Sequence, residues 1–176
     1  MKRLPSILFA LAGLAGTAAS AQSPPSVEVR FDNPKRFTDF RVDRWRNARQ
    51  TQALADELRR WIEYEAPRHL PAGSKLTVTI TDVDMAGEFE PWQRADAMDI
   101  RVVREIYPSR VSLAFRLADD TGKVIAEGER KLVSAFLFSG SLGGGDGPLR
   151  YEKRLVADWL SREFGVSRGA SRHADR

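Results

Sequence analysis

The sequence predicts an α+β fold, with a mainly antiparallel sheet of four to five strands, two helices packed on one face, and a cleaved signal peptide before it. Three observations predict it. The chain starts with a short apolar leader, most later segments alternate as strands do, and two segments have helical spacing. Helices on one face of such a sheet bury all their apolar stripes in a single core.

The first residues have the features of a secretory signal. A basic start, MKR, precedes an apolar run from Leu4 to Ala15, and ASA at residues 19–21 fits the small-x-small cleavage rule. The apolar run is shorter than the roughly 20 residues that cross a bilayer. We therefore predict that residues 1–21 are a signal peptide, and that the mature product is a soluble periplasmic or secreted protein.

The mature chain is expected to form one domain, residues 22–164, followed by a disordered basic tail, residues 165–176. The formal net charge of +4 is shared equally between the leader and the tail, so the domain itself is near neutral. Nucleic-acid binding requires clustered excess positive charge, so we expect no nucleic-acid partner. The absence of cysteine excludes disulfides, thiolate ligands and a cysteine nucleophile.

In the first half of the chain, VEVRF at 27–31 alternates and predicts a strand. A helix follows, with Asp43 as its expected N-cap and Pro67 after its end. Lys75 to about Met85 is the second strand, and Glu88 to Asp99 is expected to be a loop. The apolar helix face is expected to contain Thr51, Leu54, Leu58, Trp61, Ile62 and Glu65.

In the second half, DDTG at residues 119–122 predicts a hairpin turn, in which Gly122 is free to adopt a positive φ. Clean alternation before this turn predicts one hairpin strand, and Lys123 to Val133 returns as its partner. The remaining expected elements are a strand with a mixed pattern at Ile100–Ile106, a glycine-rich loop at Ser139–Pro148 and a helix at Leu149–Phe164.

Two acids occupy an unexpected position in the second strand. Asp82 and Asp84 are in phase with the apolar Leu76, Val78 and Ile80, on the strand face that should be buried. Carboxylates two residues apart on a strand lie roughly 6–7 Å from each other. That spacing suits a pair of catalytic acids or two ligands for a divalent cation.

A structural role explains the same pair without a ligand. A buried carboxylate is costly unless it has a partner, so these acids require backbone donors or basic side chains. We expect Asp82 to be paired inside the fold and Asp84 to lie nearer solvent. The basic side chains available for this pairing are Arg101, Arg104 and Arg110, which could also meet Glu152 across the sheet.

Two aromatic residues follow the acids in a polar loop. Phe89 and Trp92 in EFEPWQR serve either local packing or contact with a ligand or partner, since aromatic residues are enriched in interfaces. The candidate binding residues are Asp82, Asp84, Phe89, Trp92, Arg101 and Arg104.

Known catalytic and cofactor motifs are missing. The only histidines are His69 and His173, and Ser141 in GSLGG does not form a G-x-S-x-G elbow. SLGGGDGP lacks the lysine of a phosphate-binding loop. We therefore assign no catalytic residue, no cofactor and no metal ligand.

Several segments together are similar to a known bacterial family. They are FDNPKRFTDF, LTVTITDVDMAGE, DIRVVREIYPSRVSLAFRL, GKVIAEGERKL and LRYEKRLVADWL. The chain resembles the family called domain of unknown function 3016, over roughly Val27 to Phe164, and departs from it in the GSLGGGDG loop and the basic tail. The resemblance implies an exported bacterial protein and supplies no catalytic residues.

The leading functional hypothesis is a non-enzymatic binding or interaction module of the bacterial envelope. It would contact an envelope protein, a lipid surface or a small ligand through the loop Met85–Met98 and the adjoining acids. The alternatives are a cation-binding protein or hydrolase-like enzyme built on Asp82 and Asp84, and a purely structural protein that assembles with itself. The sequence leaves the oligomeric state open.

Overall fold

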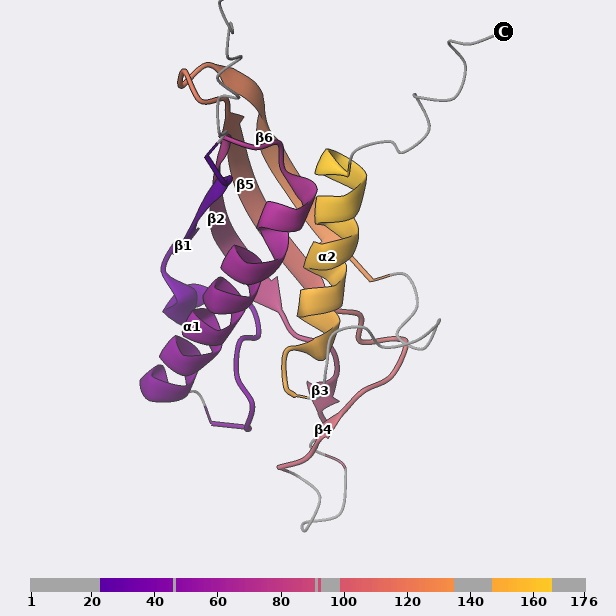
Figure 1. The fold of residues 1–176 in the computed structure, drawn as a ribbon. Coiled ribbons are helices and arrows are strands. Elements are labelled where there is room, and N and C mark those ends of the chain that lie inside the picture. Colours follow the sequence, from indigo (N-terminus) through magenta and orange to yellow (C-terminus); the bar gives the residue numbers. More distant parts are fainter. Residues whose placement is uncertain (1–22, 46, 91, 93–98, 135–146, 166–176) are drawn as a thin grey trace, which may run out of the picture.

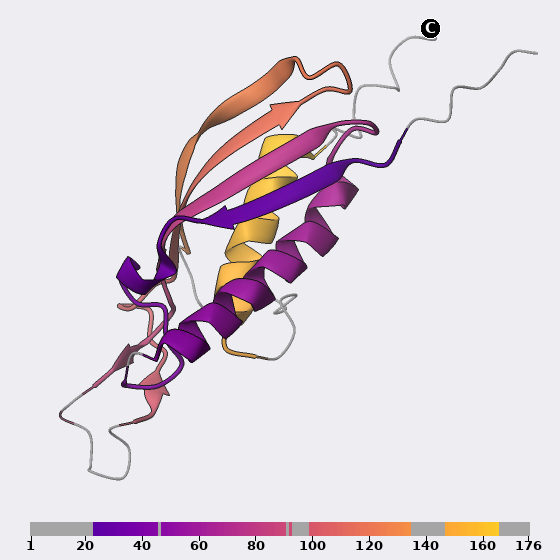
Figure 2. The same ribbon diagram turned by 90° about the vertical axis from the view of Figure 1, so that its left-hand side faces the viewer.

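A computed structural model describes residues 23–45, 47–90, 92, 99–134 and 147–165. Two helices cover one face of a four-stranded sheet, and a small two-stranded sheet lies at one end of the molecule (Figures 1 and 2). The α+β prediction is therefore confirmed. The predicted signal peptide, most of the glycine-rich loop and nearly all of the basic tail lie outside the described residues.

The elements follow the expected order, with one difference in the middle of the chain. The segment predicted as a strand at Ile100–Ile106 contributes only two strand residues, and these pair with two residues of the predicted loop. The elements are β1 (Ser26–Phe31), η1 (Pro34–Arg36), α1 (Ala48–Glu65), η2 (Ala66–His69), β2 (Lys75–Asp84), β3 (Glu88–Phe89), β4 (Arg101–Val102), β5 (Arg110–Ala118), β6 (Val124–Val133) and α2 (Arg150–Phe164).

The main sheet is mixed, which corrects the expectation of a mainly antiparallel one. Its strand order is β1-β2-β5-β6, and β1 runs parallel to β2 while the other two pairs are antiparallel. The parallel pair follows from the connection, because α1 crosses over between β1 and β2, and a parallel pair requires such a crossover. A second, two-stranded sheet joins β3 to β4 in an antiparallel pair.

The core lies between the helices and the covered face of the sheet (Figure 2). Thr51, Leu54, Leu58 and Ile62 of the predicted α1 face are buried there, while Trp61 and Glu65 are only partly buried. Leu58 and Leu160 of α2 are completely inaccessible to solvent. Helix α1 begins later than expected, because Asn47 rather than Asp43 is its cap and accepts from the N–H of Arg49. No helix of the described residues combines the length and apolar character needed to cross a membrane.

A β-bulge in β2 overturns the expected orientation of the two acids. Ile80 pairs with Leu113 but Asp82 pairs with Ser112, so Thr81 is one extra residue in β2. Beyond the bulge the side chains exchange faces, since one inserted residue reverses the alternation of a strand. Val83 is buried in the core, and Asp82 and Asp84 point to the face of the sheet that carries no helix.

The exchange of faces predicts effects of different size on stability for two matched substitutions. Val83→Thr places a hydroxyl in the core without a partner and should lower the free energy of unfolding by about 1–3 kcal/mol. Thr81→Val, at an exposed position, should change it by less than about 0.5 kcal/mol. Urea denaturation of both variants measures this, and equal effects at the two positions would contradict the bulge.

Candidate functional site

Each of the two strand acids is held by protein donors on the open face of the sheet. Asp82 accepts hydrogen bonds from the backbone N–H and the hydroxyl of Thr38, at 2.7 and 2.8 Å. Asp84 pairs with Arg110 of β5 at 2.7 Å. The two carboxylates therefore fix neighbouring segments to the end of β2. The described residues contain no group of three or more acidic or histidine side chains able to hold a metal ion.

The most buried ion pairs lie around Asp39, just after η1. Its carboxylate pairs with Arg41 at 2.8 Å and with Arg101 of β4 at 2.9 Å, and all three side chains are largely shielded from solvent. Arg101 also donates to the backbone oxygens of Gly87 and Arg41. Through these contacts Arg101 joins the segment after β1, the end of β2 and the small sheet.

Phe89 of β3 is part of this cluster and does not face solvent. The guanidinium groups of Arg101 and Arg41 lie 4.6 and 5.3 Å from the centre of its ring. Both distances are within the range of a cation–π interaction. Phe89 is 7% exposed, so it supports the small sheet from inside and is not available for contact with a partner.

A second buried acid anchors the other side of the small sheet. Glu90 is 1% exposed, and its carboxylate pairs with Arg104 at 3.0 Å and accepts a long hydrogen bond from the Tyr107 hydroxyl. Desolvation first and the neighbouring Glu90 charge second raise the pKa of Tyr107. Arg104 keeps half of its side chain exposed, so it links a buried charge to the surface.

Glu152, in the first turn of α2, is a third buried acid. Its Oε1 accepts from the N–H of Ala86 and from the hydroxyl of Ser109, which fixes α2 to the end of β2 and the start of β5. Its Oε2 has no hydrogen-bond partner among the described residues. Burial raises the pKa of Glu152, because removal from water disfavours the charged form, although the two hydrogen bonds and the charge of Arg101 oppose the shift.

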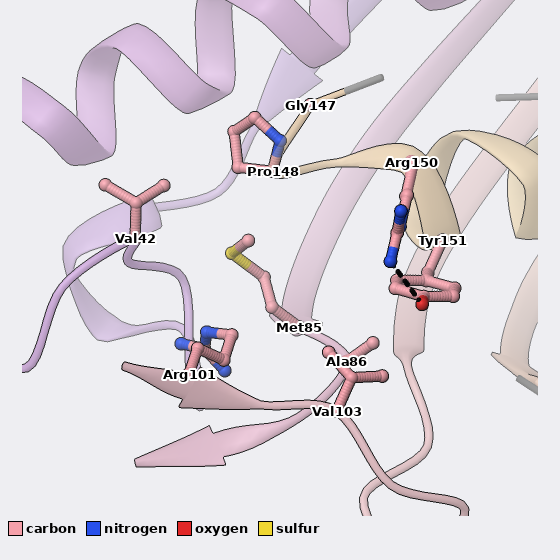
Figure 3. A pocket seen from close by; sticks show the side chains of 9 residues that line it. All are labelled: Val42, Met85, Ala86, Arg101, Val103, Gly147, Pro148, Arg150 and Tyr151. Atoms are coloured by element: carbon pink, nitrogen blue, oxygen red, sulfur yellow. Dashed lines mark hydrogen bonds between the residues drawn. The ribbon is translucent and has the colours of Figure 1, made fainter. Parts of the chain in front are cut away.

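A pocket of about 210 Å³ opens between these elements (Figure 3). Figure 3 shows the side chain of Met85 at its centre, between Val42 and Pro148, with Arg101 and Arg150 on opposite sides. The lining residues are Val42, Met85, Ala86, Arg101, Val103, Gly147, Pro148, Arg150 and Tyr151.

Four large apolar side chains are exposed on segments that adjoin the small sheet or its contacts. Trp92 and Ile100 lie beyond β3 and β4, and Ile106 precedes β5; they are 69%, 59% and 70% exposed. Trp45, which is 73% exposed, follows the segment that Arg101 and Arg41 hold against the small sheet. We call these four residues the apolar tip.

The structure brings together part of the predicted set. Arg101, Arg104 and Phe89 belong to one buried network, while Asp82 and Asp84 lie on the open sheet face with other partners. Sequence reasoning missed Asp39 and Glu90 as the acids that pair with these arginines. Glu152 was expected as a possible partner of these arginines. Its burial also had a signal in the sequence, because it lies one turn before Leu155 and Val156 on the apolar stripe of α2.

Comparison with known protein families shows to which family the chain belongs. Residues 25–162 match the family described as protein of unknown function, DUF3016. The chain is a DUF3016 protein. The description of this family names no activity, and no curated protein matches the sequence.

A solved structure is similar to this DUF3016 protein at low identity. It is the crystal structure of protein XCC0632 from Xanthomonas campestris, assigned to the family DUF330. The two chains are 10% identical, with a TM-score of 0.35, and the match covers 83% of this chain and 86% of the other.

Two arginine–aspartate pairs in the DUF3016 protein differ in burial and allow a matched test. Arg101→Met leaves the buried Asp39 with Arg41 alone and should destabilise by about 3 kcal/mol, at the lower end of the range for a broken buried pair. Arg110→Met removes a pair whose arginine is half exposed and should cost less than about 1 kcal/mol. Urea denaturation measures both, and similar losses would show that the Asp39 network does not stabilise this end.

The raised pKa of Glu152 predicts a pH dependence of stability. The folded protein keeps a proton on Glu152 that the unfolded chain loses near its ordinary pKa of 4.5. The free energy of unfolding therefore falls as the pH rises from about 4.5 through the raised pKa. Glu152→Gln should remove this decline.

The exposed Glu127→Gln in β6 is the control and should leave the decline unchanged. Urea denaturation at a series of pH values between about 4.5 and 8 measures both variants. The prediction is wrong if Glu152→Gln follows the same curve as the wild type.

Proposed function

We propose that this protein is a non-enzymatic interaction module of the bacterial envelope, which contacts a partner protein through the apolar tip. The observation that supports it is the exposure of Trp45, Trp92, Ile100 and Ile106 on segments whose bases are fixed by buried charges. Tryptophan is among the side chains that contribute most to protein–protein affinity. Exposed large apolar side chains mark interaction sites where they form a patch, and these four come from segments next to the small sheet in the chain or through its contacts.

The segments below the apolar tip are held in place by buried contacts, which favours a role of the tip in binding rather than in folding. A partner that meets a preorganised surface loses less conformational entropy than one that must order a loop. Here Arg101, Phe89 and Asp39 hold the small sheet in place while the tip residues themselves make little contact with the core. The tip is thus arranged to present apolar surface rather than to bury it within the chain.

The envelope as the place of action rests on the leader. Residues 1–21 have the charge, apolar length and cleavage site of an export signal. Fractionation of cells that express the full chain tests this directly. Recovery of a product shortened at Ala21 outside the cytoplasm supports the proposal, and a full-length cytoplasmic product contradicts it.

Site-specific photo-crosslinking tests the tip. A photoreactive amino acid at Trp92 should form a discrete adduct in envelope fractions, and the same amino acid at Tyr64 should not. Tyr64 is 67% exposed on α1 and lies roughly 24 Å along the helix from its start, so it matches Trp92 in exposure but not in position.

Competition then distinguishes specific contact from chance capture. Excess unlabelled wild-type protein should abolish the adduct, and a Trp45→Ser, Ile106→Ser variant should compete at least tenfold less well. Equal competition by this variant, or an adduct of the same mass from position 64, would rule out the apolar tip as the contact surface.

A further inference from the structure

The pocket of Figure 3 is built by four separate parts of the chain, one of which is β4 and the residue after it, with Arg101 and Val103. Val42 comes from the segment before α1, Met85 and Ala86 follow β2, and Gly147 to Tyr151 lead into α2. Gly147 has a φ of 141°, which L side chains rarely adopt, so the turn at the pocket edge requires glycine. The pocket is therefore a built feature of the tertiary fold, since no single loop forms it.

The lining combines an apolar floor with positive charge. Five of the nine lining residues are apolar, and the two charged ones are both arginines, Arg101 and Arg150, with no carboxylate among them. Most small-molecule sites have this composition, in which apolar walls provide contact area and a few polar groups fix the orientation of the ligand. At about 210 Å³, this pocket is below the usual range of roughly 300–1,000 Å³, so its ligand is small.

The positive charge around the pocket is not fully balanced. Arg101 and Arg41 share the single carboxylate of Asp39. Arg150 makes no ion pair within the described part of the chain; it donates to the Tyr151 hydroxyl at 2.7 Å and stacks on that ring. The nearby Glu57 is already paired with Lys153 at 2.6 Å.

Two further features make the electrostatic potential in the pocket more positive. The pocket lies at the start of α2, where the helix dipole contributes partial positive charge. Glu152 lies behind Ala86, and its raised pKa reduces the negative charge that it places near the pocket.

We propose that this pocket binds a small amphipathic carboxylate, with its apolar body against Met85 and Val103 and its carboxylate on Arg150. Arginine pairs with carboxylates through two parallel hydrogen bonds, which gives both affinity and a fixed orientation. The apolar part is limited in size by the pocket and corresponds to a medium-length aliphatic chain or a single ring. This inference does not depend on the proposed partner, because the apolar tip and the pocket are lined by different side chains.

Isothermal titration with three ligands of equal chain length tests the charge requirement. Sodium octanoate should bind, whereas octylammonium and 1-octanol should bind at least tenfold more weakly. Arg150→Gln should weaken octanoate binding at least tenfold, because it removes a charge-assisted hydrogen bond. Arg162→Gln, which removes an exposed arginine from the last turn of the same helix, should leave the affinity unchanged.

A second pair of variants tests the location independently of charge. Val103→Trp fills the pocket and should abolish octanoate binding, while Val133→Trp, at an exposed position on β6, should not. Thermal unfolding verifies that each variant is folded, and if Val103→Trp is not, the Arg150→Gln comparison decides alone. Equal binding of octanol, full affinity in Arg150→Gln, or binding in a folded Val103→Trp variant would each overturn the proposal.

Discussion

The single extra residue in β2 determines how this end of the molecule is built. With Thr81 inserted, Val83 enters the core and Met85 and Ala86 arrive beside the start of α2, where Ala86 donates to Glu152. Without it, Asp82 and Asp84 would face the helices with no partner on that side, at a cost of several kcal/mol for each buried charge. The bulge therefore fixes which side chains reach the pocket and which reach the open face.

Beyond the bulge, buried charged side chains, rather than apolar packing, hold the segments in position. Asp39, Glu90 and Glu152 are each less than 6% exposed, and each holds segments that are distant in sequence. Buried ion pairs contribute little net stability when compared with apolar residues of the same shape, but a misplaced partner is strongly penalised. The small sheet has little core of its own, and its two residue pairs alone cannot fix its position. The buried ion pairs can, because any other position would leave a buried charge without its partner.

The larger helices and strands could be predicted from the sequence because the periodicity of each lies within one segment. The stripe around Leu58 and Ile62 and the alternation around Leu113 and Phe115 each lie within one segment, and both were predicted correctly. The two main errors had visible signals. A strand, a helix and a strand in succession favour a parallel pair, and Val83 with Met85 continues the apolar pattern of β2 in the opposite phase.

The pairing of Asp39 with Arg101 and of Glu90 with Arg104 had no such signal. These residues lie in segments without a repeating pattern, and their partners become neighbours only when β3 and β4 pair. Such contacts are set by tertiary structure, so charge identity alone left several equally good partners for each arginine. The sequence predicted that arginines neutralise acids at one end of the sheet. Arg110 does pair with Asp84, as expected, but Arg101 and Arg104 pair with Asp39 and Glu90 instead of the strand acids.

Arg101 connects the two surfaces proposed here. Its guanidinium holds Asp39, the backbone of Gly87 and Arg41 and the ring of Phe89, and its side chain also lines the pocket. A ligand changes the affinity of a second site only if it interacts differently with two states of an element that both sites share. Arg101 is the side chain that the two proposed sites share, so a ligand on Arg150 that drew the Arg101 guanidinium away from Asp39 would weaken the contacts at the base of the apolar tip. Such a linkage would act in both directions, because coupling between two binding sites is reciprocal, so a partner that fixed the tip would also fix the position of Arg101 in the pocket.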